Sequence, residues 1–123
     1  MRKISFALTL LLVLLLTASV SNAQLKVQSG TWGADKRTVP SYMLGAGGEM
    51  ERSLTLSFTF TKPFIAKPEV IVSINTFDGD ANINTRYDVK TISVHKTGFT
   101  VEVKTWGGSK INMIGGTWMA IGE

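Results

Sequence analysis

Residues 53–60 read Ser-Leu-Thr-Leu-Ser-Phe-Thr-Phe and alternate between small polar and large apolar side chains. Because successive side chains of a β-strand point to opposite faces, the two leucines and two phenylalanines share one face. This period of two is typical of a strand with one face on a core and the other in solvent. Helical periodicity is nearly absent from the rest of the chain, so the sequence favours an all-β fold.

Further strands are indicated by β-branched and aromatic residues between turn signals. The Asn-rich stretch 78–84 is typical of a loop, and residues 95–98 predict a tight turn in which Gly98 supplies a permissive backbone. Six strands with hairpin-length connections predict a six-stranded antiparallel β-sandwich. The segments assigned as strands in addition to residues 53–60 include 69–77, 84–94, 99–106 and 111–121.

Three segments depart from simple alternation. Tyr87 and Val89 share one strand face while Ile92 faces the other way, which predicts a β-bulge near Lys90-Thr91. Gly115-Gly116 predicts another bulge or a close backbone approach. The segment from Gly30 to Gly48 carries five glycines and little alternation, so we expect a long surface excursion there.

The first 23 residues have the pattern of a secretory signal peptide. Arg2 and Lys3 precede a leucine-rich apolar run, and Ser21-Asn22-Ala23 supplies the small residues that a signal peptidase recognises. The sequence therefore predicts a signal peptide over residues 1–23 and one domain over residues 24–123, in an extracellular or periplasmic protein. An uncleaved membrane anchor is the alternative, although the run is short for a span and no stop-transfer cluster follows it.

Composition excludes several classes of site. The chain has no cysteine, so disulfides, thiol nucleophiles and zinc-thiolate centres are excluded. Without Arg2 and Lys3, the 13 basic residues become 11 against 9 acidic residues, a net charge of +2, and no basic run remains that would suit nucleic acid. A domain of this size without cross-links is often stabilised by self-association.

An aromatic residue ends the strand at residues 99–106. Counting in twos from Phe99, Val101 and Val103 on the core face puts Trp106 on the opposite, polar face. A large ring on that face is suited to contact a ligand from solvent or a neighbouring subunit. Trp118 lies in an apolar strand and is expected in the core, whereas the role of Trp32 is left open.

Seven fragments, in order and spacing, closely resemble the H-type lectin domain over residues 25–122. That resemblance implies a six-stranded sandwich that forms trimers, often paired into hexamers. It also implies binding of galactose-type sugars, with N-acetylgalactosamine the best-known ligand, and no requirement for a metal or other cofactor. The fragments are Val27-Gln28-Ser29-Gly30, Phe58-x-Phe60, Pro68-x-Val70-x-Val72-Ser73, Asn84-x-Arg86, Thr97-Gly98-Phe99, Thr105-Trp106 and Trp118-Met119-Ala120-Ile121.

The resemblance also implies a sugar site. Arg86 and Trp106 match the family's arginine and tryptophan, and Gly47-Gly48-Glu49 aligns with its Gly-x-Asp stretch, with glutamate in place of aspartate. Gly107 stands where a histidine often follows the tryptophan. Asn112 stands where a neighbouring subunit would lend an aromatic residue. Guanidinium, carboxylate and indole groups together suit a ligand that offers hydroxyls and a patch of C–H bonds.

These residues also have other interpretations. Arg86 and Glu49 have the alternative of being solvated surface charges or a weak ion pair. A glycosidase pair would need Glu49 or Glu51 with Asp78 or Asp80, but these lie in predicted loops and no other catalytic motif is present, so we expect no enzyme. We therefore expect a secreted, metal-independent lectin that recognises or agglutinates glycan-covered surfaces through multivalent weak sites. The alternative is a structural or adhesive secreted β-sandwich subunit without sugar binding.

Overall fold

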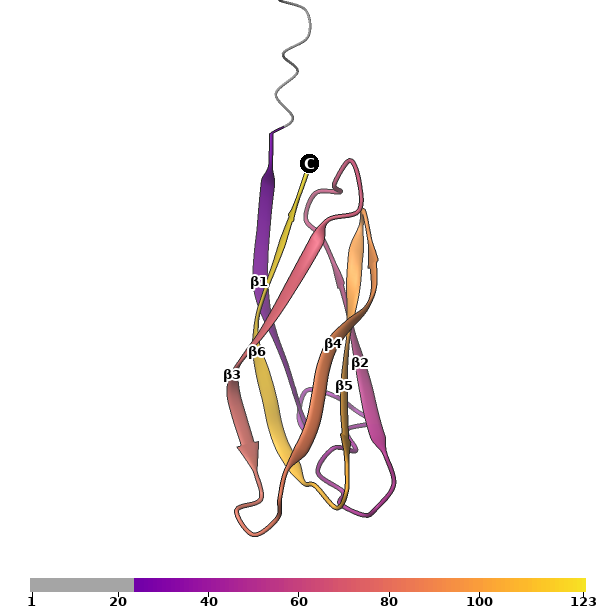
Figure 1. Cartoon of the computed structure of the whole chain (residues 1–123), viewed down its shortest axis with the longest axis vertical. Coiled ribbons are helices and arrows are strands. Elements are labelled where there is room, and N and C mark those ends of the chain that lie inside the picture. The colour runs from indigo at the N-terminus through magenta and orange to yellow at the C-terminus, as the bar shows by residue number, and fades with distance from the viewer. Residues whose placement is uncertain (1–23) are drawn as a thin grey trace, which may run out of the picture.

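The computed structural model describes residues 24–123 as six antiparallel strands in two sheets, and the described residues form no helix. This confirms the prediction of an all-β, six-stranded antiparallel sandwich (Figure 1). The predicted signal peptide at residues 1–23 lies outside the described residues. The strands are β1 (Lys26–Asp35), β2 (Arg52–Thr59), β3 (Glu69–Gly79), β4 (Arg86–His95), β5 (Gly98–Trp106) and β6 (Ile111–Gly122).

Each sheet has three strands. The first sheet has the order β1-β6-β3 and the second has the order β2-β5-β4, so β6 and β5 are the central strands. Between residues 24 and 123, no helix is long and apolar enough to cross a membrane.

The core lies between the central strands. Val101 and Val103 of β5 are fully buried, as alternation requires of inward-facing positions. Ile111 and Ile114 of β6 are fully buried as well, and the pairing of β6 with β3 shifts its register between Ile111 and Met113. At one end of the sandwich the core becomes aromatic, because Phe58, Phe60 and Trp118 all pack around Phe99, with ring centroids 5.0–5.6 Å from it. Trp118 is thus part of the core packing, as the sequence predicts.

The irregularities expected in the strands are present. Thr91 pairs with Val101 and Ser93 pairs with Thr100, so Ile92 is the extra residue of a bulge beside the predicted position. Gly116 allows a close approach, because a Cβ there would lie on the carbonyl oxygen of Ser73. The bulge opposite the glycine pair is in the neighbouring strand β3, where register shifts between Ile74 and Thr76.

The prediction of a surface excursion from Gly30 to Gly48 is wrong for residues 30–35 and correct in that a long loop begins at residue 36. Strand β1 continues through Asp35, and the Trp32 side chain is only 5% exposed. The Trp32 indole nitrogen donates a hydrogen bond to the carbonyl oxygen of Ser73 at 3.0 Å. Glycines on either side of Trp32 hide the alternation of this strand, since they add no apolar side chain to the pattern.

A smaller correction concerns Gly98. It does not have a positive φ angle; the positive-φ glycines are Gly47, Gly48, Gly107 and Gly108. A Cβ at Gly98 would instead collide with the carbonyl oxygen of Phe58, so the requirement at this position is close packing of β2 against β5.

The two ends of the sandwich carry different loops. We call one the Arg86 end; it consists of loops 36–51, 80–85 and 107–110 and lies at the bottom of Figure 1. We call the other the Lys62 end; it consists of residues 24–25, the loop 60–68 and the turn 96–97, close to the C-terminus.

Candidate functional site

Trp106 is the last residue of β5, and its side chain is 37% exposed. The residue before it, Thr105, is fully buried, so the two point to opposite faces of the sheet. This confirms that the indole is outside the core, at the Arg86 end.

Arg86 begins the neighbouring strand β4 and pairs directly with Trp106. Side chains of directly opposed residues in antiparallel strands lie on one face, with Cβ atoms roughly 4.5–5.5 Å apart. The guanidinium Nη1 of Arg86 donates a hydrogen bond to the carbonyl oxygen of Gly107 at 3.3 Å. The guanidinium and the indole are therefore held side by side.

Gly107 and Gly108 form the turn against which Arg86 lies. Both have positive φ angles, 67° and 78°, where residues with a Cβ are strained. A Cβ at Gly107 would lie 2.6 Å from Nη1 of Arg86, so a side chain here would displace the guanidinium. Where the resemblance implies that a histidine often stands, this chain has a glycine without a side chain. Arg86 occupies the space that the histidine side chain would need.

Glu49 reaches the other side of the same turn. A Cβ built at Gly108 would lie 3.9 Å from the Glu49 carboxylate, and the amide of Gly108 donates to the carbonyl oxygen of Gly48 at 3.0 Å. The loop requires glycine at position 47, since the φ angle there is 74° and a Cβ would lie 2.8 Å from Cε of Lys110. The Gly47-Gly48 stretch thus brings Glu49 to the turn that Arg86 also contacts.

The two charges are not neutralised by each other. Over residues 24–123 the ion pairs within 4.0 Å all involve Lys90 or Lys104, and none joins Arg86 to Glu49. Both side chains are exposed. Donors and acceptors therefore remain available to a polar ligand.

A buried arginine holds the loops of this end together, and sequence reasoning missed it. The Arg52 guanidinium donates to the carbonyl oxygens of Ser109 at 2.8 Å and Leu44 at 3.2 Å. It also lies within 3.5 Å of the carbonyl oxygens of Gly48 and Met50. Because these acceptors are backbone carbonyls, and that of Ser109 is 57 residues away in sequence, only the burial of a charged residue at the start of a strand signals this role, and only once the fold is known.

Two buried hydroxyls fix the backbone of Arg86, and these too were missed. Arg86 donates its amide hydrogen to Oγ of Ser109 at 2.8 Å. The Thr105 hydroxyl donates to the carbonyl oxygen of Arg86 at 2.6 Å. Ser109 also lies 2.6 Å from the carbonyl oxygen of Trp106. Arg86 and Trp106 are thus positioned by side chains that face the core.

Asn112 is not part of this cluster within one chain. It lines a depression with Lys36, Tyr42, Gly45 and Ala46. Beneath it, the Tyr42 hydroxyl donates to the carbonyl oxygen of Ile111 at 2.7 Å, and burial raises the pKa of Tyr42 to about 12. Contact between Asn112 and a sugar would require the neighbouring subunit that the resemblance implies.

Two of the carboxylates considered for a catalytic pair, those of Glu51 and Asp80, have other partners. Glu51 is ion-paired with Lys104 at 3.3 Å, and this contact raises the pKa of the Lys104 ammonium. Asp80 accepts the amide hydrogen of Asn82 at 2.9 Å, and Asp78 pairs with Met113 in the sheet. Among residues 24–123, no three His, Cys, Asp or Glu side chains lie close enough to hold a metal ion.

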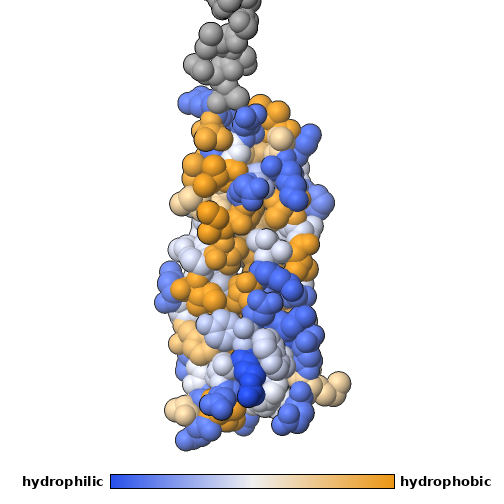
Figure 2. Space-filling view, viewed as in Figure 1, coloured by the Kyte–Doolittle hydropathy of each residue, from blue (hydrophilic) through white to orange (hydrophobic). Residues whose placement is uncertain are grey.

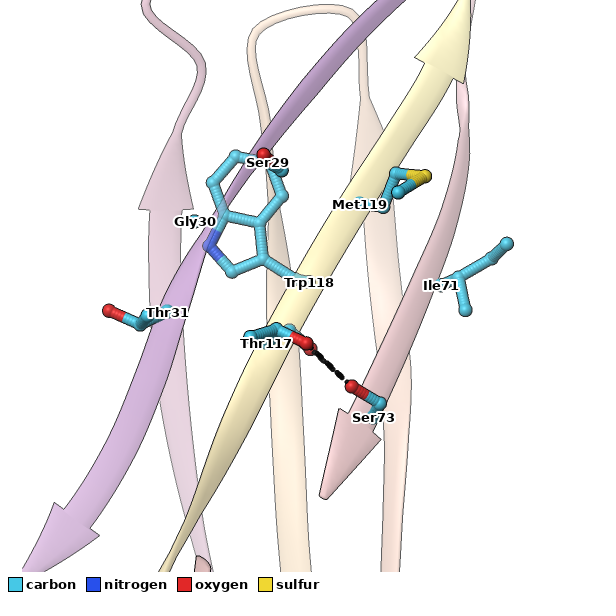
Figure 3. A pocket seen from close by; sticks show the side chains of 8 residues that line it. All are labelled: Ser29, Gly30, Thr31, Ile71, Ser73, Thr117, Trp118 and Met119. Atoms are coloured by element: carbon cyan, nitrogen blue, oxygen red, sulfur yellow. Dashed lines mark hydrogen bonds between the residues drawn. The ribbon is translucent and has the colours of Figure 1, made fainter. Parts of the chain in front are cut away.

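A shallow depression also lies on the outer face of the first sheet. Ile71 and Met119 flank it, while the hydroxyls of Ser73 and Thr117 are 2.7 Å apart and satisfy each other (Figure 3). It contains no charged side chain. Its chemistry suits contact with another protein surface better than recognition of a polar ligand.

One family model and one curated relative match this chain. A model described as the H-type lectin domain matches residues 55–121, more than half of the chain. A protein of Fuscovulum blasticum, "ATP synthase subunits region ORF 7", is 35% identical over 82 residues, which cover 63% of this chain and 71% of that protein.

Solved structures share the fold. Discoidin II of Dictyostelium discoideum superimposes with a TM-score of 0.68 at 19% identity, covering 83% of this chain and 38% of that chain. The R1 pyocin fibre of P. aeruginosa gives a TM-score of 0.51 at 20% identity, covering 83% of this chain and 24% of that chain. This chain thus spans well under half of either, and at such identities the likeness concerns the fold alone.

Proposed function

The chain belongs to the H-type lectin domain family, a family of carbohydrate-binding domains, and from that premise we propose that it binds galactose-type sugars on glycans without a metal. N-acetylgalactosamine is the proposed preferred ligand. One observation carries the proposal. The Arg86 guanidinium and the Glu49 carboxylate flank the Gly107-Gly108 turn, and Trp106 is paired with Arg86.

The chemistry of the three groups is complementary to a sugar. Arg86 presents N–H donors in a planar fork, and one of them is already fixed on the carbonyl oxygen of Gly107. Glu49 accepts hydrogen bonds from adjacent hydroxyls, and the exposed indole of Trp106 packs on the C–H face of the ring. Glutamate is one methylene longer than the family's aspartate, so the sugar is expected to sit farther from the loop backbone.

A site this shallow binds weakly, with a Kd of millimolar order, because few apolar atoms are buried. Useful affinity then depends on several sites in one assembly. The outer face of the first sheet supports association as a trimer or hexamer. It presents the exposed apolar residues Val27, Ile71 and Met119. On the face of the domain drawn in Figure 2, apolar side chains form patches mainly in the upper part. The outer face of the second sheet is charged instead, with ion pairs around Lys90 and Lys104.

Export is part of the proposal and has its support in the sequence. The leader at residues 1–23 has the charge, apolar run and small residues of a signal peptide, with cleavage near Ala23. A secreted protein of this kind would bind or agglutinate glycan-bearing cells and would need no catalysis to do so.

The test is retention on immobilised galactose and N-acetylgalactosamine, with release by the free sugar. The wild-type protein is expected to be retained, and Arg86→Ala is expected to elute without retention while keeping its thermal midpoint. Arg37→Ala is the matched control, because Arg37 is an exposed arginine in a loop of the same end. If neither sugar retains the wild-type protein, or if both variants behave alike, the proposed site is wrong and the structural-subunit alternative is favoured.

A further inference from the structure

The net positive charge of the domain is concentrated at the Lys62 end. Residues 24–123 carry a net charge of +2, since only Arg2 and Lys3 precede them. Counted together with the strand ends next to its loops, the Arg86 end has five basic and five acidic residues, which cancel, and along the middle of the second sheet two of each cancel. Counted in the same way, the Lys62 end has four lysines and two acidic residues, Glu69 and Glu123. The four lysines are Lys26, Lys62, Lys67 and Lys96.

These lysines are exposed, and within residues 24–123 none of them takes part in an ion pair. Hydrogen bonds bring their segments together. The backbone amide of Phe64 donates a hydrogen bond to the carbonyl oxygen of Lys96 at 2.9 Å. The side-chain amide of Gln28 donates a hydrogen bond to the carbonyl oxygen of Lys62 at 2.7 Å. Lys26 pairs with Gly122 at the start of β1. The four charges therefore belong to one fixed surface.

Large apolar side chains are exposed at the same end. Ile65 is 71% exposed and stands between Lys62 and Lys67 in the loop, while Leu25 is 67% exposed beside Lys26. An apolar side chain that is exposed to water among unpaired lysines does not contribute to the stability of the fold.

The loop displays Ile65 rigidly. On its inner side, Phe60 and Phe64 are buried and packed edge to face, with ring centroids 5.0 Å apart. The amide of Ile65 is hydrogen-bonded to the carbonyl oxygen of Glu123. The exposure of Ile65 is therefore a property of the fold, since its neighbours hold the loop in place.

A groove opens between β1 and β2 at this end. Its lining includes Lys26 and Lys62, two threonines and one tryptophan, namely Thr59, Thr61 and Trp118. Ammonium and hydroxyl donors around a groove suit an anionic oxygen ligand such as a phosphate ester.

We infer that the Lys62 end binds the anionic surface of a lipid bilayer. The lysines would lie at the level of the phosphate headgroups, and Ile65 and Leu25 would enter the boundary with the acyl chains. The apolar residues favour a bilayer over an acidic polysaccharide, because a polysaccharide offers nothing that would bury them. The described part of the chain also begins at this end, at residue 24.

Membrane binding at the Lys62 end goes beyond sugar binding and also sets the orientation of the candidate sugar site. The candidate sugar site lies at the other end of strands of 8–12 residues, which at about 3.3 Å per residue is roughly 30 Å away. A domain lying on a membrane by its Lys62 end would hold its sugar site outward.

The test is cosedimentation of the protein, purified from expression of the full chain, with vesicles of phosphatidylcholine alone or mixed with phosphatidylglycerol. Intact mass identifies the N-terminus that is present. Binding is expected only to the mixed vesicles and is expected to fall as salt rises, since the Debye length shortens from about 10 Å at 0.1 M to about 3 Å at 1 M. Binding to neutral vesicles alone would be due to a retained leader and would contradict the inference.

Variants assign the binding to this end. The double variant Lys62→Gln, Lys67→Gln is expected to lower partitioning roughly 25-fold, at about fivefold per lysine. The matched control Lys36→Gln, Arg37→Gln removes the same charge at the Arg86 end and is expected to leave partitioning unchanged. Ile65→Ser is expected to weaken binding at low and high salt alike. All these side chains are exposed, so circular dichroism should show an unchanged fold.

Three results would overturn the inference. One is equal partitioning of the two double variants, and another is no preference for phosphatidylglycerol. The third is binding to immobilised heparin that depends on Lys62 and Lys67 but not on Ile65, which would assign the surface to an acidic polysaccharide. Retention on immobilised sugar, measured on the same samples, is independent of all three and keeps a failure here distinct from a failure of the lectin function.

Discussion

The amide of Arg86 donates a hydrogen bond to the hydroxyl of Ser109 at 2.8 Å, across 23 residues of sequence. The same hydroxyl oxygen lies 2.6 Å from the carbonyl oxygen of Trp106. Ser109 is fully buried, so water does not compete for these bonds. One serine thus joins the start of β4 to the end of β5, and with them the two side chains proposed to bind sugar.

Replacing this serine should therefore damage both stability and the site. Ser109→Ala leaves the partly buried amide of Arg86 without its acceptor, which is expected to cost roughly 1–3 kcal/mol of unfolding free energy. Sugar retention should fall as well, because Arg86 loses its position. Denaturant unfolding and sugar titration measure the two effects. A variant as stable as the wild-type protein would mean that the hydroxyl is not the anchor of Arg86.

The Gly107-Gly108 turn offers a matched pair of variants. Gly107→Ala and Gly108→Ala both place a Cβ on a backbone of positive φ, which costs about 1–2 kcal/mol in each case. Only at Gly107 would the Cβ strike the Arg86 guanidinium, at 2.6 Å. We expect similar losses in thermal stability and a loss of sugar retention in Gly107→Ala alone. Equal retention by the two variants would exclude the guanidinium from the site.

Trp106→Ala should abolish sugar binding while the fold is kept, because the indole is outside the core. Its far-UV circular dichroism and thermal midpoint should stay close to those of the wild-type protein. Ile92→Ala, at another exposed apolar residue of the same sheet, is the control and should retain sugar binding. Unfolding of Trp106→Ala would contradict the outward orientation.

Strict alternation made most of the fold predictable. The segment 53–60 was placed within one residue of β2 because each inward position carries an apolar side chain. The first strand was misjudged past Gly30, since Gly33 separates the two inward side chains Trp32 and Ala34 and weakens the pattern. A glycine that allows a neighbouring ring or backbone to approach closely contributes to packing, but it adds no apolar side chain to the sequence pattern.

The site was predictable only in part. Strand alternation alone placed Trp106 outward, whereas the partnership of Arg86 with Trp106 came from the family resemblance. Arg52 and Ser109 were missed because their partners are backbone groups of loops far away in sequence. No pattern of residue types marks such contacts, since any backbone carbonyl can accept them.

Tyr42 predicts an alkaline loss of stability. Its pKa is raised to about 12 in the folded chain, so the neutral hydroxyl that donates to Ile111 is favoured by folding. The stabilisation is complete below the ordinary pKa of 10 and is lost as the pH rises from there through about 12. The Tyr87→Phe variant leaves Tyr42 as the one tyrosine of residues 24–123, and titration of its tyrosinate absorbance should give a midpoint near 12.

Tyr42→Phe is the complementary variant. It should be less stable than wild type at neutral pH, because the carbonyl oxygen of Ile111 loses its donor, and its stability should not fall with Tyr42 ionisation. A midpoint of about 10 in Tyr87→Phe would show that the hydroxyl is solvated and that the 2.7 Å hydrogen bond does not persist in solution.

Arg52 supplies the sharpest test of how the loops are held. Arg52→Met keeps an unbranched side chain of similar length but leaves the carbonyl oxygens of Leu44 and Ser109 without a donor. We expect a loss of roughly 2–4 kcal/mol in unfolding free energy and, because the loop that bears Glu49 is released, weaker sugar binding. Amide exchange at Gly108, whose hydrogen bond joins that loop to the 107–110 turn, should accelerate in the variant. If stability falls while exchange at Gly108 and sugar retention stay unchanged, the loop is anchored by other contacts and Arg52 supports the core alone.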